Sequence, residues 1–141
     1  MPEEEKTIKD FEQLTGLLKK KEICKRTVVV WPEEDHTQEA ILQATHEGFI
    51  SPILVCSERT KKIFADREAL QAVTAENPEE ASRIAVKIIR EQKADIIMKG
   101  FVNTDVLLRA ILDKEHGILP RGAVLTHITV TKIPEYPKLL F

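Results

Sequence analysis

The stretch Ala94-Asp95-Ile96-Ile97-Met98-Lys99-Gly100-Phe101-Val102-Asn103-Thr104-Asp105 decides how the rest of the sequence is interpreted. Its first part is a short apolar run behind a polar lead-in, which is typical of a buried strand. Lys99 and Gly100 end that run, and both Asn103 and Thr104 are residues that cap helices. A strand that leads through a glycine turn into a helix directs backbone N–H groups and the positive end of the helix dipole toward its loop. We therefore predict an anion-binding loop at this position.

The segments that follow the loop are predicted to be a helix, a turn and a strand. Apolar residues at helical spacing carry the helix to about Glu115 or His116, and Gly117 is expected to end it. Arg109 lies one to two turns into this helix and, with Lys99, adds positive charge near the loop. Residues 119–122 are rich in turn formers, and residues 124–131 alternate in the manner of a strand.

The residues before the loop alternate between predicted helices and predicted strands. Asp35 with Gln38 suggests a capping box, Gly48 suits the end of the same helix, and residues 77–80 begin a helix with Asn77 as its cap. The predicted helices cover 7–21, 35–47, 58–66 and a stretch from 78, and the predicted strands cover 27–31, 52–56, 70–74 and 95–98. This alternation predicts an α/β protein with an open, mostly parallel sheet and helices on both faces, a three-layer α/β/α arrangement.

Composition limits the possible functions. The 141 residues are enough for a single α/β domain, and 43% hydrophobic with 31% charged residues is typical of a globular protein. A net charge of -2 and few aromatic residues argue against nucleic acid as a partner. No apolar run is long enough to span a bilayer. The acidic start, residues 1–5, does not resemble an export signal, and two isolated cysteines suit reduced thiols, so we expect a cytoplasmic protein.

Several residues with possible chemistry also have a simpler explanation. Lys19, Lys20 and Lys21 are either an anion-binding patch or, more simply, a helix end that matches its dipole. Cys56 is expected to be a small buried residue rather than a nucleophile. His36 and His46 have no other ligand types at metal spacing beside them, so no metal site is predicted.

The chain stops within an apolar run, residues 139–141. Natural domains more often finish in polar residues, so we expect a portion of a longer protein, although a short C-terminal strand against the sheet is an alternative. A partial protein is expected to expose apolar surface and to self-associate as a homo-oligomer.

Residues 98–117 resemble the phosphate acetyl/butyryltransferase family, most closely its phosphate butyryltransferase branch. Neither a G-x-G-x-x-G nor a P-loop motif is present, so no nucleotide fingerprint competes with this assignment. Weaker similarity lies at residues 39–40, 47–48, 52–55, 126–128 and 136–140. Two residues depart from the family pattern: Cys56 stands where the family usually has Gly, and Thr126 where it usually has Ser.

The resemblance implies an isocitrate/isopropylmalate dehydrogenase-like fold, with residues 1–141 as the first domain of a two-domain acyltransferase. Members exchange acyl-CoA and phosphate for acyl phosphate and CoA, which are substrates, so no cofactor is expected. The family's catalytic base belongs to the second half, so the catalytic residues of this chain are unknown and we expect it to be inactive alone. An alternative is a non-catalytic α/β module for small-molecule binding or assembly.

The candidate phosphate/CoA-binding residues all have an ordinary structural role as an alternative. Lys99 suits phosphate as a point charge, and Arg109 suits it as a bidentate fork. Alternatively, both are solvated side chains. Gly100 allows close backbone approach or only forms the turn. Asn103 and Thr104 donate to an anion or only cap the helix. His127 contacts the ligand or is an ordinary histidine of the core or of the cleft wall. The candidates are therefore Lys99, Gly100, Asn103, Thr104, Arg109 and His127.

Overall fold

Four parallel strands form one sheet in the computed structural model of the protein, which describes residues 7–141. The strands are β1 (Lys25–Val30), β2 (Ile50–Cys56), β3 (Gln71–Thr74) and β4 (Ile96–Lys99). Their order across the sheet is β3-β2-β1-β4, and every neighbouring pair is parallel. Each strand was predicted to within a few residues, and the α/β class is confirmed. The acidic start, residues 1–5, lies outside the described residues.

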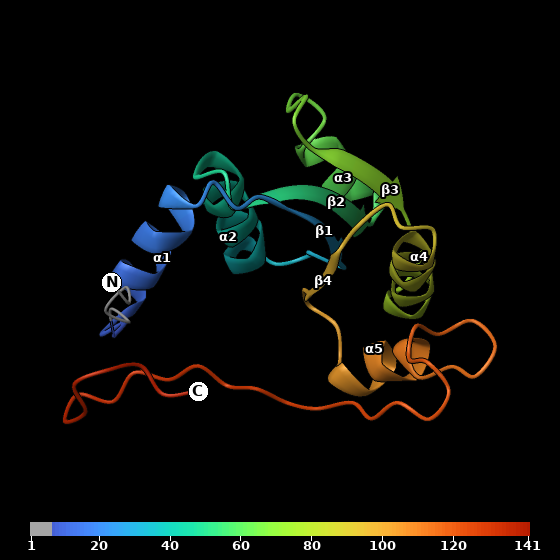
Figure 1. Cartoon of the computed structure of the whole chain (residues 1–141). Helices are drawn as coiled ribbons and strands as arrows, with labels where there is room; N and C mark the ends of the chain where they lie inside the picture. The colour runs from blue at the N-terminus through green and yellow to red at the C-terminus, as the bar shows by residue number, and fades with distance from the viewer. Residues whose placement is uncertain (1–6) are drawn as a thin grey trace.

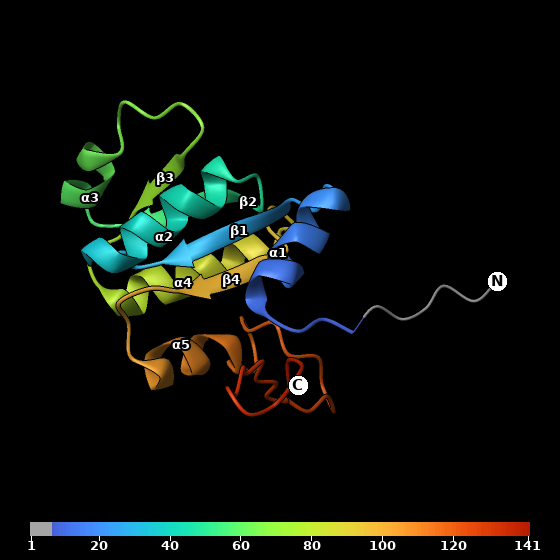
Figure 2. The same ribbon diagram turned by 90° about the vertical axis from the view of Figure 1, so that its left-hand side faces the viewer.

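Five helices connect and cover the strands, as Figures 1 and 2 show. They are α1 (Phe11–Lys20), α2 (Asp35–His46), α3 (Glu58–Ile63), α4 (Pro78–Arg90) and α5 (Thr104–Ile111). In Figure 1, α2 and α4 lie on opposite sides of the sheet, and α5 lies beside α4. This arrangement agrees with the prediction of helices on both faces of a parallel sheet.

Strand β1 is the centre of the core. Val28, Val29 and Val30 are all fully buried, as expected for a strand covered on both faces. Successive side chains of a strand point to opposite faces. Val28 and Val30 therefore pack with the α4 side chains Ala81 and Ala85, whereas Val29 packs in a second cluster with Ile41 and Phe64 from the α2–α3 side. Each buried valine contributes about 1.5–3 kcal/mol through removal of its side chain from water.

The predicted starts of α2 and α4 have different outcomes. The prediction at α4 is confirmed, because Asn77 Oδ1 accepts from the Glu80 N–H at 2.8 Å and Glu80 Oε2 accepts from the Glu76 N–H at 2.7 Å. The prediction at α2 is wrong. Glu34 holds the N-cap position there, without a side-chain cap, and Asp35 already lies inside the helix. Gln38 instead donates through Nε2 to the Pro32 carbonyl at 2.9 Å.

Helix α5 is shorter than predicted: it ends at Ile111 rather than near Glu115. The Asp113 side chain is the physical reason, because its Oδ1 accepts from the backbone N–H groups of Glu115 and His116 at 3.0 and 2.6 Å. Side-chain bonds of this kind offer the backbone an alternative to the helix. The turn is completed by the Gly117 N–H, which donates to the Asp113 carbonyl at 2.9 Å.

The strand predicted over residues 124–131 is wrong for this structure. These residues form no strand, and the nearest pairing is an isolated antiparallel bridge between Thr131 and Leu140. Alternation alone does not make a strand, since its backbone groups need a neighbouring strand. Farther along, Leu139 is buried at 3% exposure, and its N–H donates to the Ile8 carbonyl at 3.0 Å.

Helix α1 is confirmed as a helix, with Asp10 rather than an earlier residue as its cap. None of its residues is buried, and Phe11 and Leu17 of its apolar stripe are 48% and 37% exposed. Within residues 7–141, no helix has the length and apolar character needed to cross a membrane.

Candidate functional site

The loop after β4 lies where the strand order reverses. From β1 the chain continues to β2 on one side, and it returns through α4 to place β4 on the other side of β1. In open parallel sheets, ligands bind outside the carboxyl ends of the strands at such a switch point. Two loops border this position: residues 31–34 after β1 and residues 100–103 after β4.

Backbone hydrogen bonds join these two loops. The Gly100 N–H donates to the Val30 carbonyl at 2.9 Å, and the Phe101 N–H donates to the Trp31 carbonyl at 2.8 Å. The expectation that these N–H groups face a ligand is therefore wrong, because the protein itself uses them. Gly100 provides the close approach: a Cβ there would lie 2.5 Å from the Val30 oxygen and 2.6 Å from the Trp31 oxygen.

Trp31 was not selected from the sequence, and its backbone is unusual. Its φ of 56° lies in the left-handed region, which is costly for a residue with a side chain. Non-glycine residues held in this region occur often at functional sites. The strain here lies directly beside the loop after β4. The sequence predicts Trp31 at the end of the strand 27–31 and does not predict this left-handed backbone.

The start of α5 presents two of the candidate side chains to solvent. Asn103 occupies the N-cap position but its side chain makes no capping hydrogen bond, contrary to the expectation that it caps the helix. Asn103 and Thr104 are both exposed. The amide of Asn103 and the hydroxyl of Thr104 are therefore accessible at the positive end of the α5 dipole.

The two candidate cations are also exposed. Lys99 is the last residue of β4. Arg109 donates through Nη2 to Asp105 Oδ2 at 3.3 Å, and its side chain is 82% exposed. An exposed pair one turn apart is weak and screened by salt, so an anion at the α5 start can compete with Asp105 for Arg109. Four candidates therefore follow one another from the end of β4 to the start of α5, namely Lys99, Gly100, Asn103 and Thr104, and Arg109 lies farther along α5.

His127 is not joined to these residues by any described contact. It lies in the unpaired segment 124–131, and its Nε2 is 3.3 Å from Thr129 Oγ1 of the same segment. The proposed place of His127 on a strand in the cleft wall depended on the strand that is absent here.

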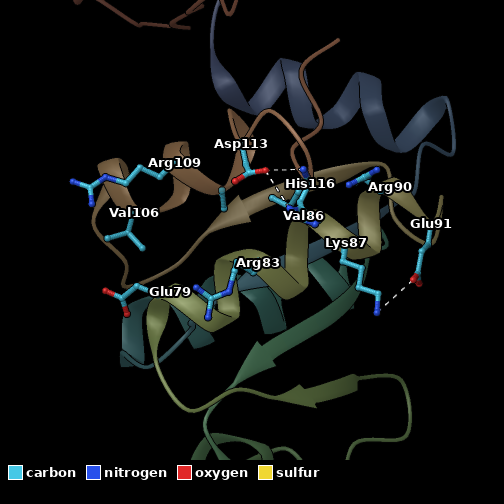
Figure 3. Close-up of a pocket in the computed structure, with 11 residues that line it drawn as sticks. Glu79, Arg83, Val86, Lys87, Arg90, Glu91, Val106, Arg109, Asp113 and His116 are labelled. Carbon is cyan, nitrogen blue, oxygen red and sulfur yellow. Dashed lines mark hydrogen bonds and ion pairs between the residues drawn. The ribbon is translucent and has the colours of Figure 1, made fainter. Parts of the chain in front are cut away.

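Sequence analysis missed a groove between α4 and α5, which Figure 3 shows. Its cavity volume is about 840 Å³, which is in the range of small-molecule pockets. Val86, Val106 and Ala110 contribute apolar surface, and charged residues of both signs surround it. Dashed lines in Figure 3 mark the Lys87–Glu91 and Asp113–His116 pairs. Charged residues spaced one turn apart on α4 (Glu79, Arg83, Lys87) were the available sequence signal. Arg109 also lines the groove.

Sequence analysis also missed Glu33, which connects the loop after β1 to α3. Glu33 Oε1 accepts from the Ser57 N–H at 2.7 Å, and Oε2 accepts from the hydroxyls of Ser57 and Thr60 at 2.8 and 2.6 Å. The carboxylate thereby fixes the ends of β1 and β2 relative to each other. Burial, and secondarily the Glu33 charge, raises the pKa of the neighbouring Cys56 thiol to about 11. Cys56 is fully buried, as predicted, and an elevated pKa makes it a poor nucleophile.

Over residues 7–141, no three His, Cys, Asp or Glu side chains are grouped so that they could hold a metal ion. In that same range Cys24 is exposed and Cys56 is buried, and both are free thiols.

Comparison with known proteins identifies the class of the chain. No protein-family model matches it. The phosphate butyryltransferase of Clostridium beijerinckii is 33% identical over 138 residues, which are 94% of this chain and 45% of that protein. The probable phosphate butyryltransferase of Bacillus subtilis is 32% identical over 135 residues, 92% of this chain and 44% of that protein. The phosphate acetyltransferase of Thermotoga maritima is 29% identical over 121 residues, 82% of this chain and 40% of that protein.

A solved structure has a similar fold. The branched-chain phosphotransacylase of Enterococcus faecalis V583 superposes with a TM-score of 0.59 over 70% of this chain and 36% of that one, at 17% identity. At this identity the superposition shows a common α/β fold. The chain belongs to the phosphate acetyl/butyryltransferase family. It spans about half the length of the curated relatives it matches.

Proposed function

We propose that this chain is part of an enzyme that converts acyl-CoA and phosphate to acyl phosphate and CoA. The observation that supports this most directly is the loop 99–104 at the switch point, in a chain of the phosphate acyltransferase family. The reaction places negative charge on phosphate and on the carbonyl oxygen of the acyl group. Fixed cations and N–H donors stabilise such charge when they are directed at it in advance.

The roles we propose follow from the exposed groups of the loop and of α5. Lys99 is a point charge for a phosphate oxygen. Asn103 and Thr104 donate from the positive end of α5, and Arg109 approaches the same anion once it leaves Asp105. Gly100 lets the loop lie close against the backbone of Val30 and Trp31, which holds the loop in place. We also keep His127 as a candidate whose role requires the segment 124–131 to reach this cleft.

The finer fold assignment is part of the same proposal. We propose an isocitrate/isopropylmalate dehydrogenase-like domain, the first of two, with the substrate cleft between them. The phosphate-binding wall is assigned to residues 99–109 and the catalytic base to the other domain. On this proposal the chain alone binds phosphate and CoA but does not catalyse.

An NMR titration tests the binding part. Phosphate and CoA are added separately to ¹⁵N-labelled protein, and the amide signals of residues 100–105 are followed. We expect both ligands to shift these signals, and Lys99→Ala and Arg109→Ala to weaken phosphate binding at least about threefold each, because each removes a charge-assisted contact. Lys61→Ala on α3 is the matched control and is expected to leave the titration unchanged. Unchanged signals at millimolar phosphate would contradict the proposed site.

An assay of acyl phosphate formation tests the division of roles. It compares the 141-residue chain with a longer natural family member into which the equivalent of Arg109→Ala has been introduced. We expect no turnover by the chain alone and a reduced rate in the altered relative. Turnover by the chain alone would refute the assignment of the base to another domain.

A further inference from the structure

Strand β4 has an open edge. It is the last strand of the order β3-β2-β1-β4, and among the described residues it pairs with β1 alone. Ile96 at this edge strand is 45% exposed, whereas the central residues of β1 are fully buried. An exposed edge with apolar residues is a template for another strand, and Lys99 is the only residue of β4 with the charge that normally protects such an edge.

The segment Val124–Thr131 has the opposite property, because it is built like a strand but lacks a sheet. Val124 and Ile128 are 82% and 75% exposed, and Leu125 is 50% exposed. The segment contains five β-branched residues after Leu125, which favour a pleated surface. Within the described chain, its backbone pairs only at Thr131, through two hydrogen bonds of 2.9 Å with Leu140.

The chain on both sides of this segment is anchored to other parts of the fold. At one end, Arg90 Nη1 donates to the Glu115 carbonyl at 3.1 Å and the Ile118 N–H donates to the Ile111 carbonyl at 3.0 Å. At the other end, Leu139 is buried and bonded to Ile8. In Figure 1 the chain after α5 runs below α1 and does not join the sheet. Pairing with its own β4 would require an anchor to release, whereas pairing with a neighbouring molecule keeps both anchors.

We propose that residues 124–131 of one copy of this chain add as a strand to the β4 edge of a second copy, and that the second copy returns the same contact. Strand addition to an open edge satisfies backbone groups on both sides and covers the exposed apolar side chains. Each copy offers one edge and one free segment, so the reciprocal exchange closes as a two-fold dimer without leaving an open end. This inference does not depend on the proposed enzymatic function.

Solution mass tests the proposal. Sedimentation velocity across a range of concentrations is expected to give a dimer for the unaltered chain. Ile96→Lys on the edge and Ile128→Lys on the segment should each raise the dissociation constant at least about tenfold, since both place a charge in the new pairing. Ile63→Lys on α3 is the matched control, because it changes a residue of similar exposure (54%) far from β4 in the sequence and should leave the dimer intact. Circular dichroism verifies that each variant is folded.

A mixed sample provides a test without any substitution. Half of the protein molecules in the sample are isotope-labelled and the other half are unlabelled. NMR then records contacts between a labelled and an unlabelled copy selectively. We expect contacts between the amides of β4 in one copy and residues 124–131 in the other. A monomer at all concentrations, a dimer that both lysine variants leave unchanged, or contacts found only within one chain would each overturn the proposal.

Discussion

The hydroxyl oxygen of Thr60 lies 2.6 Å from Oε2 of Glu33, although 27 residues separate them in the sequence. Thr60 is 2% exposed, so its hydroxyl has little access to water and depends on this carboxylate. Ser57 donates to the same carboxylate through both its N–H and its hydroxyl. One acidic side chain therefore fixes the loop after β1 against the start of α3.

Glu33→Gln is expected to destabilise the protein by about 1–3 kcal/mol, because three donors would face an amide that accepts through only one oxygen. Urea unfolding followed by circular dichroism measures the change. Glu34→Gln is the matched control and should lose less stability, since within residues 7–141 the Glu34 carboxylate accepts a hydrogen bond only from the Thr37 hydroxyl, at 2.9 Å. The double variant Glu33→Gln/Thr60→Val should lose less unfolding free energy than the sum of the losses in the two single variants. Additive losses would show that the two residues are not coupled.

Gly100→Ala is expected to cost about 1–3 kcal/mol of stability, because its Cβ would meet backbone oxygens of Val30 and Trp31 that have no flexible end to move away. The control is Gly16→Ala in α1, where an added Cβ meets nothing within 4 Å. That change should be neutral or stabilise by up to about 1 kcal/mol, since alanine favours helices. Thermal and urea unfolding of both variants measure this difference. Equal effects would contradict the role assigned to Gly100.

Cys56 predicts a loss of stability in alkali. Its folded pKa of about 11 lies above its ordinary value of 9.0, so the folded state favours the neutral thiol. Its contribution is therefore complete below about pH 9 and decreases as the pH rises toward 11. Urea unfolding of the protein and of Cys56→Ala between pH 8 and 11 isolates this effect, because other titrating groups are common to both. A difference between the two that stays constant with pH would refute it.

The Arg26–Asp95 pair predicts a loss of stability in acid. Arg26 donates to both carboxylate oxygens of Asp95, at 3.0 and 2.8 Å. The Arg26 side-chain hydrogen bonds, more than its charge, hold the pKa of Asp95 below the ordinary 3.8. Asp95 therefore stabilises the fold above that value and loses its contribution as the pH falls through the lower folded pKa. Asp95→Asn should remove part of the acid dependence.

Unfolding of Asp95→Asn between pH 2 and 6 gives the comparison with the unaltered chain. Asp66→Asn provides a control, because within residues 7–141 Asp66 takes part in no ion pair. The effect is expected to be modest, since both partners of the Arg26–Asp95 pair are about half exposed. An identical acid dependence for the two variants would contradict a specific role for Asp95.

Local signals were sufficient for most of the elements. The valines of β1 predicted a strand covered on both faces, and Asn77-Pro78 predicted the start of α4, because both signals act between near neighbours. The failures involve choices between local alternatives or partners far away. Gln38 bonds to Pro32 instead of completing a cap, Asp113 ends α5 early, and residues 124–131 lack a neighbouring strand.

The candidate site shows the same division. Lys99, Asn103, Thr104 and Arg109 were selected because one strand, one turn and one helix carry them in succession. The groove between α4 and α5 and the Glu33 carboxylate were not selected, since each joins segments whose meeting depends on the whole fold.

Residues 94–105, which carry the proposed anion-binding loop, therefore owe their strand, turn and helix start to the local sequence and their hydrogen-bonding pattern to the tertiary structure. The sequence by itself determined a strand, a glycine turn and a helix start, because hydrophobic periodicity and capping act over a few residues. Only the folded chain decided that the N–H groups of Gly100 and Phe101 bond to β1 while the start of α5 stays accessible. Strand order places β1 beside β4, and this long-range contact determines which backbone donors of the loop are used within the protein.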